Sequence, residues 1–272
     1  MIVHQTLAQL HTLKLGGLFV SGKQGEFFSM SVAERKRTFE LAVEAAAGHC
    51  GIVTSCSDTN LDVVLELARH SQDIGADYIV VHSPVLHFHH DAEATVYEYY
   101  RHLSEQLDIG IALWNHPDCG YIMSPELCAR IAELPNIVAI KSEQGFPLPA
   151  GICEMYHHFR DEVVISCPIE GDAIPLMSLM KLQFSGTSNT QWMGDYYPRA
   201  FELARQGEWE AAMALYWKVN PARSANGAAA QSYAGGTGVL NRTMWKYQDW
   251  LAGFNGGPLR GPAMRVPDRF MK

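Results

Sequence analysis

The sequence predicts an α/β fold of the (β/α)8 TIM barrel class with extra C-terminal helices. Short apolar runs alternate with helical patterns at spacings of roughly thirty residues, the pattern of repeated βα units with a parallel sheet. Polar residues gather just after the predicted strands, where barrel enzymes carry their active groups. The rival is an open doubly wound sheet, but no G-x-G-x-x-G stretch follows the first strand and no Walker lysine motif is present.

The elements follow from local signals. A helical pattern covers residues 4–15 and ends at Gly16-Gly17. Ser31-Val32-Ala33-Glu34 is a capping box that opens a helix to about Gly48, and Ser124 followed by Pro125 is an N-cap with proline at the first helical position. The expected strands are 18–21, 51–56, 78–82, 109–114, 137–141, 163–167 and 184–188. The other expected helices are 60–74, 91–106, 124–134, 151–159, 173–182, 197–205, 209–219 and 241–252.

A closed barrel needs eight strands, and the sequence predicts one fewer. The simplest account is that these are strands two to eight, and that the first strand is missing from this chain or hidden within it. We therefore expect a barrel over residues 1–220 and a C-terminal helical extension over residues 221–272.

Composition excludes several classes of function. The net charge is −8 and no basic run stands out, so nucleic acid is not an expected partner. No apolar stretch reaches the roughly 20 residues that span a bilayer, and the N-terminus lacks the features of a signal peptide. Six cysteines without a C-x-x-C pair indicate reduced thiols and a cytoplasmic protein.

The strand Ile137–Lys141 is the chemically informative one. It is a buried apolar run that closes on a lysine, and an ammonium is costly to bury. In a dry pocket a lysine loses its proton more readily, and the neutral amine forms a Schiff base with a carbonyl. The alternative is a lysine at a strand end with its head in solvent.

Several stretches resemble the dihydrodipicolinate synthase / N-acetylneuraminate lyase family of Schiff-base aldolases, along nearly the whole chain. The stretch Gly22-Lys23-Gln24-Gly25-Glu26 resembles the family motif Gly-Thr-Thr-Gly-Glu, and Gly75-Ala76-Asp77 matches Gly-Ala-Asp. Trp114-Asn115-His116-Pro117 resembles Tyr-Asn-x-Pro, and Ile137-Val138-Ala139-Ile140-Lys141 resembles Ile-Val-Gly-Ile-Lys. Near the end of the chain, Arg260-Gly261-Pro262 resembles Arg-x-Pro. The resemblance implies that Lys141 forms the Schiff base with a 2-oxo acid such as pyruvate. It also implies one more strand before the first predicted strand, and a homo-oligomer, either a tetramer or a dimer.

The departures from the family matter equally. Trp114 stands where the family has a proton-relaying tyrosine, and indole has no acidic hydroxyl. Lys23 and Gln24 stand where two hydroxyl residues help the relay and hold the carboxylate. Val85-Leu86 replaces a tyrosine pair, one of which reaches into the neighbouring site in the family. We therefore do not expect an ordinary dihydrodipicolinate synthase.

The predicted proton carriers are Glu143, His82 and Lys23. His82 ends a strand and titrates near neutrality, although a hydrogen-bonded core histidine is an equal alternative. Glu143 lies two residues past Lys141 and shares its face if the strand continues that far. His116 faces either the pocket or solvent. The expected substrate-binding residues are Gly22, Lys23, Gln24, Gly25, Trp114, Asn115 and Ser188.

No cofactor and no metal is expected. His87, His89 and His90, with His82, would be the candidate metal ligands, but a His-x-His-His run on a loop is more often ordinary polar content.

The expected function is lyase chemistry on a 2-oxo acid through an imine at Lys141. The alternatives are a dehydratase, decarboxylase or hydrolase on the same scaffold, and a non-catalytic barrel that binds a metabolite.

Overall fold

The computed structural model describes residues 15–84, 91–116, 121–142, 148–167, 170–180, 182–186, 190–234, 242–254, 257–262 and 268. The chain divides into two compact units. One is Gly16–Thr187, and the other combines Met1–Leu15 with Ser188–Lys272. The predicted division after residue 220 falls inside a helix, Trp209–Ala234, and the division into barrel and extension stays a prediction.

The described part of the first unit forms one sheet of six parallel strands. The strands are β1 (Gly17–Val20), β2 (Gly51–Ser55), β3 (Tyr78–His82), β4 (Gly110–Asn115), β5 (Ile137–Ser142) and β6 (Val164–Ser166). Each lies within two residues of its predicted bounds. The parallel α/β prediction is therefore confirmed.

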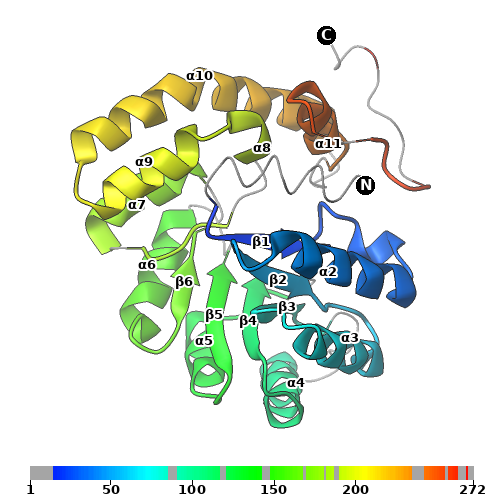
Figure 1. Ribbon diagram of the computed structural model, residues 1–272. Helices are drawn as coiled ribbons and strands as arrows, with labels where there is room; N and C mark the ends of the chain where they lie inside the picture. The colour runs from blue at the N-terminus through cyan, green and yellow to red at the C-terminus, as the bar shows by residue number, and fades with distance from the viewer. Residues whose placement is uncertain are drawn as a thin grey trace. The chain divides into compact units, whose positions relative to one another are not determined.

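The strands pair in chain order, β1 to β6 (Figure 1). A doubly wound sheet reverses its order at the point where its crossovers change sides, and no reversal occurs here. Crossovers between parallel strands are right-handed, so crossovers that all step in one direction place their helices on one face of the sheet. The strand order therefore explains why the helices stand outside the sheet in Figure 1. The open doubly wound alternative is therefore wrong for the described strands.

Capping signals in the sequence set the helix starts of this unit. Ser31 and Glu34 form the predicted capping box: the Glu34 N–H donates to the Ser31 hydroxyl and the Ser31 N–H donates to the Glu34 carboxylate. Ser124 caps the helix whose first residue is Pro125, as predicted. The helices are η1 (Phe27–Ser29), α2 (Val32–Ala46), α3 (Leu61–Asp73), α4 (Ala92–Gln106), α5 (Pro125–Ala132), α6 (Leu148–Phe159) and α7 (Glu170–Met180).

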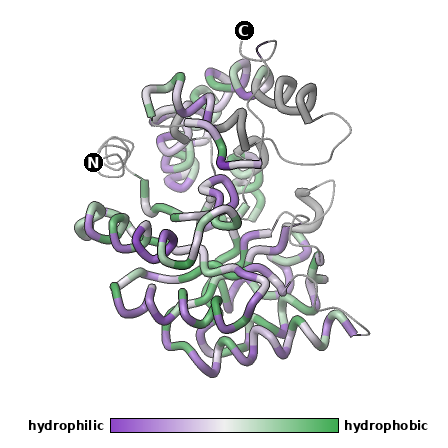
Figure 2. Tube along the Cα trace, turned by 90° about the vertical axis from the view of Figure 1, so that its right-hand side faces the viewer, coloured by the Kyte–Doolittle hydropathy of each residue, from purple (hydrophilic) through white to green (hydrophobic). Residues whose placement is uncertain are grey.

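The sheet has two different faces. The helix face carries large aliphatic side chains, and Ile52 packs there against Ala42 and Ala46 of α2. The inner face carries a cluster that includes Val53, Val80, Ala112 and Trp114. Figure 2 shows the matching pattern in the helices, where hydrophilic and hydrophobic segments alternate along the same coil.

A β-bulge sets the phase of β5. Ile111 pairs with Ile137, but the next residue, Ala112, pairs with Ala139, so Val138 is an extra residue in β5. Gly110 makes room for it, because a Cβ on Gly110 would lie 3.0 Å from a Val138 methyl carbon. After this extra residue the alternation turns Lys141 to the inner face, in the same row as Trp114.

Some predicted elements differ from the structure. The segment expected as a seventh strand, 184–188, makes an isolated bridge between Phe184 and Ser166, and residues 187–189 lie outside the described residues. The expected helix over 4–15 also lies outside them, except for its last residue. The short helices η1 and α8 (Thr190–Met193) were not predicted.

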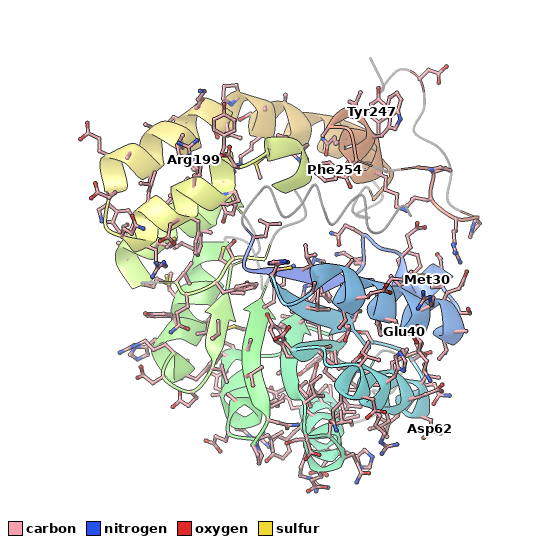
Figure 3. The ribbon with its side chains drawn as sticks, in the orientation of Figure 1. Met30, Glu40, Asp62, Arg199, Tyr247 and Phe254 are labelled. Atoms are coloured by element: carbon pink, nitrogen blue, oxygen red, sulfur yellow. The ribbon has the colours of Figure 1, made fainter. Side chains whose placement is uncertain are left out.

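The second unit contributes α8, α9 (Tyr196–Arg205), α10 (Trp209–Ala234) and α11 (Arg242–Leu251) from its described residues. α9 packs along α10, and α8 contacts both α9 and α11. Tyr247, labelled in Figure 3, lies on α11. Its ring stacks on that of Trp250 one turn further along the helix, with ring centroids 5.9 Å apart. The predicted end of α10 at residue 219 is wrong, because the helix continues past Pro221 into an alanine-rich stretch of strong helix formers.

Among the described residues, no helix combines the length and the apolar character needed to cross a membrane.

Candidate functional site

One row of side chains crosses the inner face near the carboxyl ends of the strands. His82 on β3 pairs with Trp114 on β4, Trp114 with Lys141 on β5, and Lys141 with Ser166 on β6. Paired residues of neighbouring parallel strands point to the same face. Residues predicted separately as proton carrier, substrate contact and imine former therefore stand side by side.

Trp114 is the centre of this row. Its side chain is 1% exposed, and three rings meet it edge to face. The ring centroid of His82 lies 4.7 Å from that of Trp114, and those of Phe19 and His116 lie 5.6 Å away. Aromatic pairs favour this geometry, because a positive ring edge meets a negative ring face. The indole is therefore fixed by its surroundings.

Two lysines approach the same indole. Nζ of Lys141 lies 4.3 Å from the Trp114 ring centroid, and Nζ of Lys23, from the loop after β1, lies 5.4 Å from it. Cations are attracted to an aromatic ring at such distances. Lys141 is half-buried, whereas Lys23 is 3% exposed. We call Trp114, Lys141, Lys23, His82 and His116 the Trp114 cluster.

Lys23 also contacts His116. Its Nζ lies 3.1 Å from Nε2 and 3.5 Å from Nδ1 of the imidazole, within hydrogen-bond distance. His116 is 3% exposed and follows Trp114 by two residues, which places it on the inner face. The sequence left open whether His116 faces the pocket or solvent, and the structure buries it beside Lys23.

The loop that carries Lys23 is a tight turn. The Gly25 N–H donates to the Gly22 carbonyl at 3.0 Å, and the Glu26 N–H donates to the Lys23 carbonyl at 3.3 Å. The Gly25 amide is thus used inside the turn. Gly22 lies against the Phe19 ring, where a Cβ would come within 2.7 Å of a ring carbon. A side chain at position 22 would displace the Phe19 ring, and glycine lets the loop start in close contact with that ring.

Asn115 faces the opposite way. It pairs with Ser142 in the sheet, its side chain is fully buried, and it bonds twice to the backbone of Met123. Its Nδ2 donates to the Met123 carbonyl at 3.0 Å, and its Oδ1 accepts from the Met123 N–H at 2.9 Å. These bonds tie the segment before α5 to the end of β4. Its predicted role in substrate binding stays a prediction.

Arg35 braces the neighbouring loop. Its guanidinium, 1% exposed, donates to the Ser55 carbonyl at 2.7 Å and the Ser57 carbonyl at 2.9 Å, and pairs with Asp58 at 3.2 Å. Ser57 in turn accepts from the His82 N–H at 2.9 Å. The guanidinium therefore supports the strand end that carries His82.

Among the cysteines near strand ends, Cys56 shows an unreactive setting. Burial raises the pKa of its thiol to about 11, against the opposing effects of hydrogen bonds with Ser71 and Thr54 and the charge of Arg35. A thiol with so high a pKa forms little thiolate near neutral pH. Cys56 is therefore not a candidate nucleophile.

Several predicted residues lie outside the described residues. They are Glu143, Ser188, the histidines His87, His89 and His90, and the pair Val85-Leu86. Their roles stay predictions.

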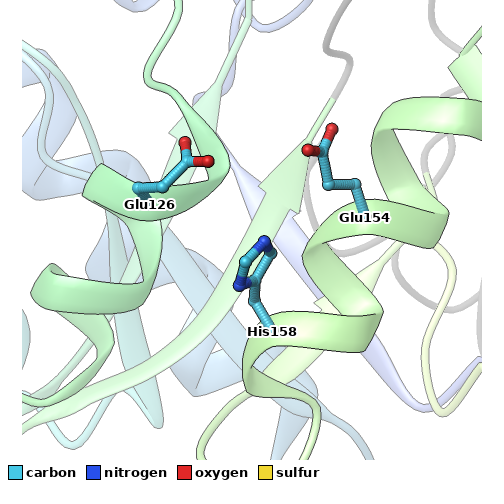
Figure 4. A group of neighbouring side chains, drawn as sticks. All are labelled: Glu126, Glu154 and His158. Atoms are coloured by element: carbon cyan, nitrogen blue, oxygen red, sulfur yellow. The ribbon is translucent and has the colours of Figure 1, made fainter.

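A different group has the composition of a metal site. Glu126 of α5 and Glu154 and His158 of α6 bring three ligand atoms within 4.8 Å of one another and point toward a common space (Figure 4). All three side chains are exposed. Exposed groups of this kind are common without an ion, and we assign no metal to this one.

Sequence reasoning missed the contact between Lys23 and His116. The alternation along β4 was the available signal, since it places His116 on the same face as Trp114. It did not show that a loop residue 93 positions away would reach the imidazole.

Comparison with known proteins identifies relatives of this chain. The chain is 27% identical over 228 residues to the 4-hydroxy-tetrahydrodipicolinate synthase of Methanospirillum hungatei, a match covering 81% of this chain and 72% of that protein. It is 34% identical over 149 residues to an uncharacterised DapA-like lyase of Thermococcus onnurineus, covering 54% of this chain and 47% of that one. The chain thus spans about half the length of the second relative.

Solved structures share the fold. The crystal structure of YagE, a prophage protein of the dihydrodipicolinic acid synthase family from E. coli K12 in complex with pyruvate, superposes with a TM-score of 0.84. The sequence identity is 19%, and the superposition covers 98% of this chain and 87% of that one. The model of the dihydrodipicolinate synthetase family matches residues 5–230, the greater part of the sequence, and the chain belongs to that family.

Proposed function

We propose that this protein is a Schiff-base lyase that acts on a 2-oxo acid through an imine at Lys141. The observation that supports it most is the position of Lys141, which the β5 bulge turns to the inner face in one row with His82, Trp114 and Ser166. A protonated imine is an electron sink, so a bond beside it breaks or forms without a free carbanion.

The comparisons support lyase chemistry at the level of the family. One matched relative is named a synthase and another a lyase, and the YagE structure contains pyruvate. Because these identities are low, the substrate of this chain is a proposal. We propose a pyruvate-like 2-oxo acid as the partner molecule, with the loop of Gly22, Lys23, Gln24 and Gly25 near its carboxylate. Trp114 and Ser188 complete the site, and Asn115 supports it through its bonds to Met123.

We further propose that the protein is not an ordinary dihydrodipicolinate synthase. Trp114 has no phenolic hydroxyl to relay protons, so the carrier is one of Glu143, His82 and Lys23. Of these, the described His82 and Lys23 both lie in the Trp114 cluster.

The proposed complete fold is an eight-stranded barrel in which β1 takes the second position. In the described sheet β1 pairs only with β2, so its other edge is where a preceding strand would add.

We also propose a homo-oligomer, dimer or tetramer. Sedimentation at micromolar concentration tests this, and a stable monomer would count against it.

Trapping tests the imine. The protein is incubated with pyruvate and sodium borohydride, and its intact mass and peptide map are measured. We expect one adduct, on the peptide that carries Lys141, and none in Lys141→Ala. Lys36→Met is the matched control, because Lys36 pairs with Glu66 on the helix side at 2.7 Å and should not affect trapping. Trapping that persists in Lys141→Ala would refute the assignment.

A further inference from the structure

We propose that Lys23 and His116 form a two-group proton relay that serves the imine on Lys141. Lys23 is the catalytic acid and base, and His116 is a positioning residue that stores the proton. This inference rests on the proposed function and adds to it the group that replaces the missing phenol.

The first support is the contact between the two groups. Nζ of Lys23 lies 3.1 Å from Nε2 of His116, and both side chains are 3% exposed. Groups that exchange a proton must lie within such a distance, and electrostatic interactions are stronger away from water. The loop after β1 and the end of β4 thus supply a donor and an acceptor already in contact.

The second support is reach. Nζ of Lys23 and Nζ of Lys141 both lie on the Trp114 indole, at 5.4 and 4.3 Å from its ring centroid, and the His116 ring lies 5.6 Å from the same point. In an imine, the methyl carbon of pyruvate is two bonds from the Lys141 nitrogen. The reacting carbon therefore forms beside the Trp114 ring, which the Lys23 ammonium also approaches.

Lys23 passes one proton from Nζ to the ring nitrogen of His116. The freed lone pair on Nζ takes a proton from C3 of the imine, and the electron pair of that C–H bond becomes the C2–C3 double bond. The π pair of the C2–N bond returns to the Lys141 nitrogen, so the iminium loses its charge as the Lys23–His116 pair gains it. Reversal returns a proton to C3.

Deuterium exchange measures this step without knowledge of the natural substrate. In D2O the methyl protons of pyruvate exchange through the enamine, and NMR follows the rate, corrected for a sample without protein. Dividing the rate by the borohydride-trapped fraction separates proton transfer from imine formation. We expect exchange per trapped imine to fall by about 100-fold or more in Lys23→Met and His116→Ala, the usual size of a general acid–base contribution.

Two further variants distinguish a relay from a structural role. Lys23→Arg keeps the charge and the donor to His116, but a guanidinium does not release its proton, so we expect trapping without exchange. In His116→Ala, added imidazole should restore exchange above the protein-free background, which a packing role would not allow. Far-UV circular dichroism checks that each variant is folded.

The outcomes are distinct. No trapped adduct in the unmodified protein would refute the proposed function and the relay with it. Trapping with full exchange in Lys23→Arg, or in both Lys23→Met and His116→Ala, would refute the relay alone and leave the imine at Lys141 in place.

Discussion

The ammonium of Lys141 lies 4.3 Å from the centre of the Trp114 indole, on the inner face of the sheet. The two residues are directly paired on β4 and β5, so the contact follows from the register rather than from a flexible loop. An aromatic ring at this distance stabilises a cation, including a protonated imine, but the indole itself supplies no hydroxyl.

The first prediction concerns this pair. We expect the unmodified protein to show no activity, or very weak activity, with pyruvate and aspartate semialdehyde or with N-acetylneuraminate, since the lost relay contributes about 10²–10⁴-fold in rate. Trp114→Tyr combined with Lys23→Thr and Gln24→Thr should raise both activities. Steady-state assays compare the two proteins, and robust synthase turnover by the unmodified protein would contradict the expectation.

The second prediction concerns Arg35. Its replacement by Met leaves two buried carbonyl groups without that donor and Asp58 without its charge partner, and should lower the free energy of unfolding by about 3 kcal/mol. Urea denaturation measures it. Arg37→Met is the control, because Arg37 is 60% exposed in an i,i+3 pair with Glu40 and should cost less than about 0.5 kcal/mol. Equal losses in the two variants would show that the buried contacts contribute nothing.

The third prediction concerns Asn115. Asn115→Asp keeps the shape but replaces the donor to the Met123 carbonyl with a buried acceptor. We expect a loss of about 2 kcal/mol in the free energy of unfolding, since a buried polar pair becomes unsatisfied. Imine trapping at Lys141 in the folded variant should persist, because the bonds of Asn115 lie on the helix side. Loss of trapping in a variant that is still folded would favour the substrate-binding role predicted from the sequence.

The fourth prediction concerns pH. Burial raises the pKa of Asp249, on α11, from 3.8 to about 6, with the charge of Lys246 acting in the opposite direction. The folded state therefore holds this proton more tightly than the unfolded state, and stability falls as the pH rises from about 4 through about 6. Asp249→Asn removes the charge and should stabilise the protein by about 1 kcal/mol at pH 7, after discounting for partial exposure.

Denaturation at pH 7 and at pH 4 checks this, and the gain should shrink at the lower pH. Asp161→Asn removes one negative charge at a side chain that is 86% exposed and serves as the control. An equal gain at both pH values would contradict the proposed cause.

Much of the fold could be predicted because its signals are local. The Ser31 capping box, the Ser124-Pro125 start and the β-branched run before Lys141 each depend on neighbouring residues, and each matches the structure. α10 was predicted too short because a proline inside a helix is a local cost that the following alanines offset.

The site was less predictable because its contacts are distant in sequence. The sequence singles out both Lys141 and Trp114, but their direct pairing depends on the extra residue in β5. Val138 and Ala139 are both small apolar residues, so the sequence does not show which of them is the extra one. The contact between Lys23 and His116 depends on the conformation of the loop after β1, which buries Lys23 until only 3% of it is exposed. The composition of the loop does not reveal that conformation.

Deletion of one codon in the gene, at Val138, is the change of length that β5 should tolerate best. Ala139 would follow Ile137 directly, the pairing of Ala139 with Ala112 and of Lys141 with Trp114 would be kept, and the amine would stay on the inner face. One codon inserted between Ala139 and Lys141 would instead add a step to the alternation and turn Lys141 toward the helices. Point substitutions around the indole change the chemistry of the site one group at a time, whereas this single in-frame insertion would remove its nucleophile.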